Sequence, residues 1–144
     1  MITLMIESKE FSYSEKQFHQ KLWQVFYKYF PDGECWTKTT INGGRASISI
    51  NCFAKQNDDN DIVNNIDKLN ISLIIQRDTI STLSFPITDK QTIKVEAIYH
   101  SIKLPNNTRE DIPFKTVIGD ADKVLRALDR FYKNAKNIYN KYYS

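Results

Sequence analysis

The feature that most constrains the fold is Asn42-Gly43-Gly44, which lies between the stretches 35–41 and 45–53. Asn and Gly tolerate the positive φ angles of tight hairpin turns, so this turn predicts that the two stretches form an antiparallel strand pair. With Gly43-Gly44 as the loop, Cys35 lies directly opposite Cys52. The sequence therefore predicts an antiparallel sheet that contains this hairpin.

The facing cysteines allow two interpretations. They could form a cross-strand redox switch, or they could be two small buried hydrophobic residues. The chain has only two cysteines and no C-x-x-C pair, which is unlike the disulfide framework of a small secreted domain and indicates a reducing compartment. The second interpretation is therefore favoured, and the pairing of Cys35 with Cys52 stays open.

Two amphipathic helices are predicted at the ends of the chain. Ser14 and Gln17 form a capping box, and Tyr13 and Phe18 have the spacing of a hydrophobic staple. Apolar residues then recur every three or four positions as far as the stop signal at 31–33. A second and longer helix is predicted to open at Gly119-Asp120 and to continue almost to the last residue, because the same spacing holds throughout.

Further strands are predicted wherever hydrophobic residues alternate with polar ones: 2–6, 71–75, 83–87, 92–104 and 114–118. The stretches 71–75 and 83–87 would form a second hairpin. The stretch 92–104 also fits a helix that begins near Thr88, but its β-branched residues and the closing Pro105 favour a strand. A short helix is predicted at 62–69.

These elements predict one α+β domain over residues 1–144. We expect an antiparallel sheet of about five to seven strands, with the N-terminal helix and the long C-terminal helix packed on one face. The same order of elements occurs in helix-grip folds, in which the last helix lies across a curved sheet and a ligand cavity can open between them. That analogy rests on element order alone.

Catalytic and metal-binding patterns are not evident. The two histidines, His19 and His100, lack companions at ligand spacing, and the acidic stretch 58–61 lacks the glycine and the closing glutamate of a calcium loop. A cysteine and a histidine could meet in space as a nucleophile and its base, but no specific motif supports this. We therefore expect no metal, no cofactor and no enzymatic activity.

The most asymmetric feature is the charge of the last helix. Residues 120–144 contain six basic and three acidic side chains, a net charge of +3 that equals the net charge of the whole chain. Arg126, Arg130 and Lys133 are spaced by four and three residues, so they share one helix face opposite the apolar side. This face could bind an acidic partner, or it could simply be solvated, because basic residues are common near helix C-termini.

Trp36 and Lys38 alternate with the inward-facing residues of the first hairpin, so they are predicted on its other face, and an exposed Trp is frequent at binding hot spots. Packing of Trp36 against a helix is the alternative. The predicted partner-binding residues are Lys123, Arg126, Arg130, Lys133, Lys141, Trp36 and Lys38.

The leading functional hypothesis is a non-catalytic protein that occupies an acidic protein partner, as small inhibitor or immunity proteins do. The alternatives are nucleic-acid binding through the basic helix and an apolar small-ligand carrier of the helix-grip type. Abundant Ile, Asn, Lys and Tyr, whose codons are rich in A and T, indicate a bacterial, phage or mobile-element origin. Because no signal peptide and no run of roughly eighteen apolar residues is evident, we expect a cytoplasmic protein without membrane association.

Overall fold

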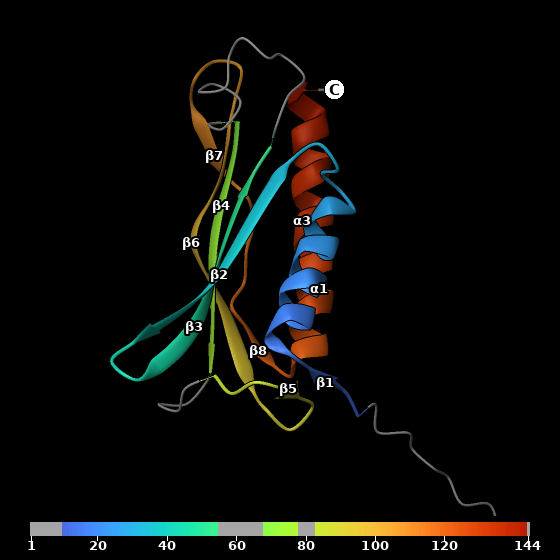
Figure 1. Ribbon diagram of the computed structural model, residues 1–144. Coiled ribbons are helices and arrows are strands. Elements are labelled where there is room, and N and C mark those ends of the chain that lie inside the picture. The colour runs from blue at the N-terminus through green and yellow to red at the C-terminus, as the bar shows by residue number, and fades with distance from the viewer. Residues whose placement is uncertain (1–9, 55–67, 78–82, 144) are drawn as a thin grey trace, which may run out of the picture.

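The computed structural model describes residues 10–54, 68–77 and 83–143. They form an antiparallel sheet with two helices, α1 and α3, side by side on one of its faces (Figure 1). The predicted α+β class is therefore confirmed, with both helices on the same side of the sheet. Within the described residues, no helix is long and apolar enough to cross a membrane.

Both helices begin at the predicted caps. In α1 (Glu15–Tyr27), the Gln17 amide donates to the Ser14 hydroxyl over 3.1 Å, and the Ser14 amide donates to the Gln17 side chain over 2.9 Å. In α3 (Ala121–Tyr143), the Asp120 carboxylate accepts a hydrogen bond of 2.8 Å from the Lys123 amide. These contacts satisfy amide groups that a helix start leaves without an intrahelical partner.

The main sheet has six strands in the order β2-β3-β4-β6-β7, with β8 also paired to β6. β7 pairs with residues 101–103 of β6 and β8 with residues 93–95, so these two short strands lie along different parts of β6. A separate two-stranded sheet joins β1 to β5. The bounds are β1 (Ser12–Tyr13), β2 (Glu34–Asn42), β3 (Arg45–Phe53), β4 (Leu69–Arg77), β5 (Ile87–Thr88), β6 (Ile93–Lys103), β7 (Arg109–Asp111) and β8 (Val117–Gly119).

The first hairpin has the predicted register. Gly43 and Gly44 adopt φ angles of 60° and 76°, which residues with a side chain rarely take, and Cys35 pairs with Cys52. β2 is the outermost strand on this side of the sheet. Near its start, the Cys35 amide donates a hydrogen bond of 3.0 Å to the hydroxyl of Tyr27 at the end of α1.

Two strand predictions require correction. The stretch 83–87 does not form a hairpin with β4, because β4 lies between β3 and β6 and pairs with both. Only Ile87 of that stretch is in a strand, and β5 pairs with β1 from the other end of the sequence. The last strand covers 117–119 rather than 114–118, because the Phe114 ring packs on Phe131 of α3 at 5.0 Å.

Of the other predicted elements, one is confirmed and several lie outside the described residues. The stretch 92–104 is a strand, β6, as preferred over a helix. β7 was not predicted, because its three residues are all charged and show no hydrophobic alternation. The predicted strand 2–6, the acidic stretch 58–61 and most of the predicted helix 62–69 lie outside the described residues.

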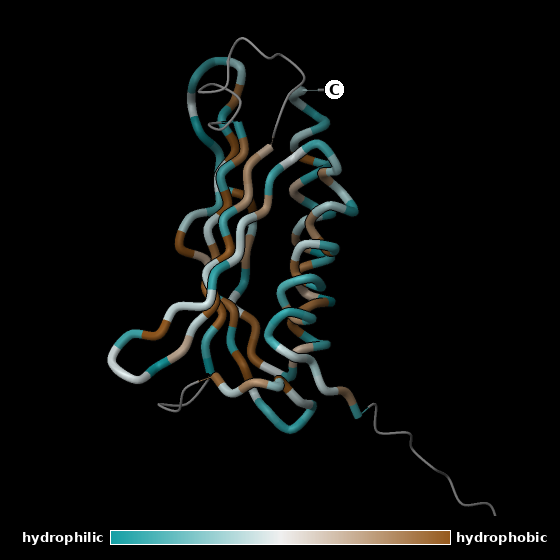
Figure 2. The backbone as a smooth tube through the Cα atoms, in the orientation of Figure 1, coloured by the Kyte–Doolittle hydropathy of each residue, from teal (hydrophilic) through white to brown (hydrophobic). Residues whose placement is uncertain are grey.

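The core lies between the sheet and the two helices. Figure 2 shows hydrophobic and hydrophilic residues alternating along the strands, as expected where one face is buried. Tyr132 of α3 is the largest fully buried side chain, and its ring meets Phe26 of α1 edge to face at 5.3 Å. The Tyr132 hydroxyl lies 3.7 Å from the Cys52 sulfur. Helix and strand side chains therefore interlock at the centre of the fold.

Candidate functional site

The predicted basic face of α3 is exposed along its length. We call this surface the cationic row, and it consists of Lys123, Arg126, Arg130, Lys133 and Lys141, all exposed. The sixth basic residue of this helix, Lys136, does not belong to the row, because its amine lies over the rings of Phe30 at 5.0 Å and Tyr139 at 5.4 Å. The row follows the side of α3 that faces away from the core.

The acidic residues of this helix accept hydrogen bonds from other groups of the protein. Asp129 accepts hydrogen bonds from the Lys28 amine at 3.0 Å and the Tyr29 hydroxyl at 2.9 Å. Burial alone would raise the pKa of Asp129, but the bonds from Lys28 and Tyr29 together lower it, so the carboxylate stays ionised. Asp122 accepts a bond of 2.7 Å from the Tyr13 hydroxyl, and Asp120 caps the helix.

The cations of the row are not neutralised in the same way. None of the five forms an ion pair with another residue in the described part of the chain. Asp122 and Asp129 therefore bond to other parts of the fold, whereas the cations of the row are exposed to solvent. Such a one-sided arrangement attracts acidic surfaces and speeds their encounter.

Trp36 and Lys38 lie on a different surface. They project from the sheet face that the helices leave uncovered, which we call the open face, and Trp36 is 64% exposed. A row of paired residues crosses this face from Trp36 through Asn51 and Ser72 to Tyr99. Short polar side chains thus separate two exposed aromatic rings.

Sequence reasoning missed the second aromatic end of this row. A β-bulge in β6 follows the pairing of Ser72 with Tyr99 and precedes that of Leu73 with Ala97, so Ile98 has no paired residue and is 65% exposed. The guanidinium of Arg109 lies 5.7 Å from the centre of the Tyr99 ring. Regular alternation along 92–104 would place Tyr99 on the same face as Val95, and the bulge moves it to the open face.

The seven predicted partner-binding residues therefore fall into two groups. Five form the cationic row on the outer side of the helix layer, and two lie on the open face of the sheet. The sheet and the helix layer separate these surfaces (Figure 1), so a single flat partner surface could contact only one of them.

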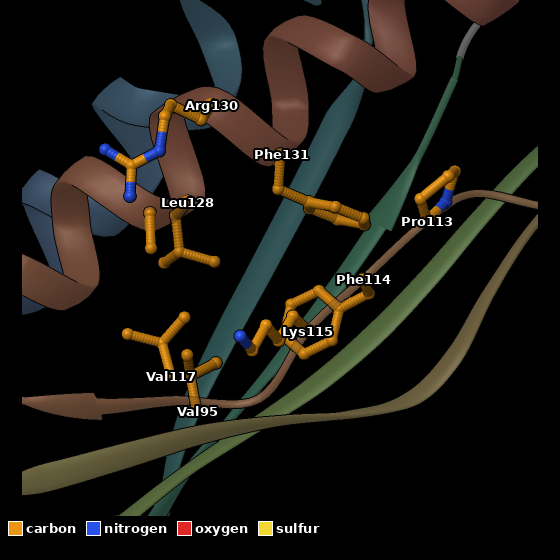
Figure 3. A pocket seen from close by; sticks show the side chains of 9 residues that line it. Val95, Pro113, Phe114, Lys115, Val117, Leu128, Arg130 and Phe131 are labelled. Atoms are coloured by element: carbon orange, nitrogen blue, oxygen red, sulfur yellow. The ribbon is translucent and has the colours of Figure 1, made fainter.

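A cleft of about 260 Å³ lies where α3 passes the segment between β7 and β8 (Figure 3). It is the place where the cationic row meets apolar side chains. Its lining residues are Val95, Pro113, Phe114, Lys115, Val117, Ala127, Leu128, Arg130 and Phe131.

The cysteines are free thiols in the core. Their sulfur atoms are 3.5 Å apart, and both residues are buried. Burial raises the pKa of the Cys52 thiol well above its usual value, and the neighbouring Cys35 raises it further. A protonated, enclosed thiol is a poor nucleophile.

The histidines are held by structural hydrogen bonds. His19 is buried between α1 and β2, where its Nδ1 lies 2.6 Å from the Thr37 hydroxyl and its Nε2 lies 2.8 Å from the Thr39 hydroxyl. Burial lowers the pKa of His19, with the charge of Glu15 opposing the shift. His100 Nδ1 contacts the Ile112 carbonyl at 2.6 Å.

Within the described ranges, no group of three or more His, Cys, Asp or Glu residues could hold a metal ion. Comparisons with protein-family models, with curated proteins and with solved structures each found no match.

Proposed function

We propose that this chain is a non-catalytic binding protein that occupies an acidic surface of a protein partner through the cationic row of α3. The observation that carries the proposal is the separation of charge on this helix. Asp122 and Asp129 accept hydrogen bonds from the N-terminal part of the chain and Asp120 caps the helix, whereas the five cations of the row are exposed and without an ion pair among the described residues.

The row is supported by a rigid base. On the opposite side of the same helix, Val124, Leu128 and Tyr132 are almost completely buried, so α3 is held against the sheet over several turns. A partner would meet side chains whose backbone is already ordered, which lowers the entropic cost of binding. Action by occupation, as in small inhibitor and immunity proteins of bacteria, phages and mobile elements, needs no catalytic group.

Nucleic acid is the competing occupant of the same row. Binding to duplex DNA releases counterions, so the logarithm of the affinity falls by about 0.9 per tenfold rise in salt for every phosphate contacted. The net charge of the chain is only +3, which is modest for a nucleic-acid-binding protein. We therefore favour a protein partner, and the experiment below separates the two.

Site-specific photo-crosslinking in cells of the source organism tests the proposal. A photoreactive phenylalanine derivative replaces Asn137, which is exposed on α3 among the cations, and in a second protein it replaces Thr40, which is exposed on β2. We expect a protein adduct from position 137 and none from position 40.

Paired charge reversals then test the row itself. Arg126→Glu with Lys133→Glu should weaken capture of the crosslinked protein roughly tenfold or more, because two attractive contacts become repulsive. Lys16→Glu with Lys90→Glu changes the net charge equally on other exposed sites and should leave capture unchanged. Equal losses in both pairs, crosslinks from position 40 alone, or a nuclease-sensitive adduct would each contradict the proposal.

A further inference from the structure

We infer that the cleft between α3 and the segment 113–117 is a binding site for a small monocarboxylic acid with an apolar body of about one ring. This site is distinct from the protein-binding use of the cationic row, although Arg130 borders both. The inference rests on how the cleft is built, what lines it and which charges stand at it.

The fold holds the cleft open by fixing both ends of one segment to β6. At one end, the Ile112 amide donates to the His100 carbonyl over 2.8 Å, and His100 Nδ1 contacts the Ile112 carbonyl. At the other end, Val117 pairs with Val95. Residues 112–116 belong to no strand, so α3 and this segment enclose a space rather than a continuous sheet.

The lining of the cleft is mainly apolar and well supported. Phe114 and Phe131 meet edge to face at 5.0 Å, which fixes both rings. Val95 and Leu128 are buried, and with Val117 they supply branched aliphatic surface from the sheet and the helix. Figure 3 shows the two rings on one side of the view and the aliphatic side chains beside them.

Two cations border this apolar space from different elements. Lys115 comes from the segment and Arg130 from α3. In Figure 3 the Arg130 nitrogens lie beyond Leu128, and the Lys115 nitrogen lies beside the Phe114 ring. Neither forms an ion pair with another described residue. The cleft thus combines two cations that have no ion pair among the described residues with a mainly apolar lining.

This combination selects a ligand class. A carboxylate can accept two parallel hydrogen bonds from a guanidinium and interact with a lysine amine, while an attached ring or branched chain covers the apolar lining. A bare inorganic anion would leave that lining in contact with water, and a neutral apolar molecule would leave both cations unpaired. The volume of about 260 Å³ lies just below the range of drug-sized pockets, which favours a single-ring body.

The test is a titration of the full-length protein followed by backbone-amide NMR and calorimetry. The probes are phenylpropionate, its neutral amide phenylpropionamide, and inorganic phosphate. We expect phenylpropionate to bind and to shift the amide signals of Val117, Ala127, Leu128 and Phe131. Phenylpropionamide and phosphate should bind at least about tenfold more weakly, because the amide lacks the negative charge and phosphate lacks the apolar body.

Matched variants locate the charge. Arg130→Gln and Lys115→Gln should each raise the dissociation constant for phenylpropionate roughly tenfold. Arg126→Gln, one turn earlier on the same exposed side and absent from the cleft lining, should leave it unchanged. Circular dichroism and thermal melting confirm that the three variants are folded.

Four results would overturn the inference. They are no binding of phenylpropionate at millimolar concentration, binding of the amide or of phosphate as tight as that of phenylpropionate, signal shifts away from the cleft, or an affinity for phenylpropionate that Arg130→Gln and Lys115→Gln leave unchanged from that of the natural protein. The test is separable from that of the proposed function, which uses Arg126 and Lys133. Either proposal can fail while the other stands.

Discussion

The two faces of the sheet differ although consecutive residues of the same strands build them. Along β3, Ile48, Ile50 and Cys52 are completely buried beneath the helices, whereas Ser49 and Asn51 between them are half-buried on the open face. The alternation of side chains along each strand is therefore sufficient to give the two faces different environments. The covered face supplies stability, and the open face is released from packing constraints and is available to interact with other molecules.

The largest expected effect is on the covered face. Phe26 is fully buried and contacts the rings of Phe30 at 5.1 Å and Tyr132 at 5.3 Å. Phe26→Ala should lower the free energy of unfolding by about 3–5 kcal/mol, since it removes buried surface and leaves a cavity. Urea denaturation measures the loss. A loss below about 1 kcal/mol would show that the covered face does not dominate stability.

An intermediate effect is expected at the margin of the core, where His19 lies under β2. Because burial lowers its pKa below the usual 6.5, the folded protein binds fewer protons than the unfolded chain as the pH falls past that value. The stability contributed by the neutral ring is therefore complete above the unfolded-state pKa and is lost as the pH drops toward the folded-state pKa.

The measurement is the free energy of unfolding between about pH 7 and pH 5 in the natural protein and in His19→Gln. Gln can still hydrogen-bond to Thr37 or Thr39 but does not titrate in this range. The natural protein should lose more stability on acidification than the variant. Parallel curves for the two proteins would mean that His19 has the same pKa in both states.

The smallest effect is expected on the open face. Trp36 is 64% exposed, and its main described ring contact is with Phe53, edge to face at 6.4 Å. Trp36→Ala should change the free energy of unfolding by less than about 1 kcal/mol, in contrast to Phe26→Ala. A loss as large as that of Phe26→Ala would show that the open face contributes to stability as much as the covered face does.

Local signals in the sequence were sufficient for much of the fold. The turn at 42–44 set the hairpin register, and the capping box at Ser14 set the start of α1, because both depend on neighbouring residues. The pairing of β5 with β1 was not predictable in this way. It joins Ile87 to Tyr13, 74 positions apart in sequence, so no local pattern reports it.

The candidate surfaces were predictable to a similar degree. The spacing of Arg126, Arg130 and Lys133 placed the cationic row correctly on one exposed side, since helical periodicity fixes relative direction. The sequence did not reveal the cleft, because Lys115 and Arg130 line the same space only when α3 packs beside the segment that precedes it. Nor did the sequence show that Trp36 and the cationic row lie on opposite sides of the molecule, since this depends on which face of the sheet α3 packs against.

The hydrogen bond between the Tyr27 hydroxyl and the Cys35 amide has a consequence for self-association. The border strand of a sheet is a template on which further chains can add and grow into fibrils. Here a side chain of the same molecule already accepts one of the backbone donors of β2. An incoming strand would have to displace the Tyr27 hydroxyl before it could form a hydrogen bond with the Cys35 amide. The end of α1 therefore opposes the addition of a further strand at this point of β2.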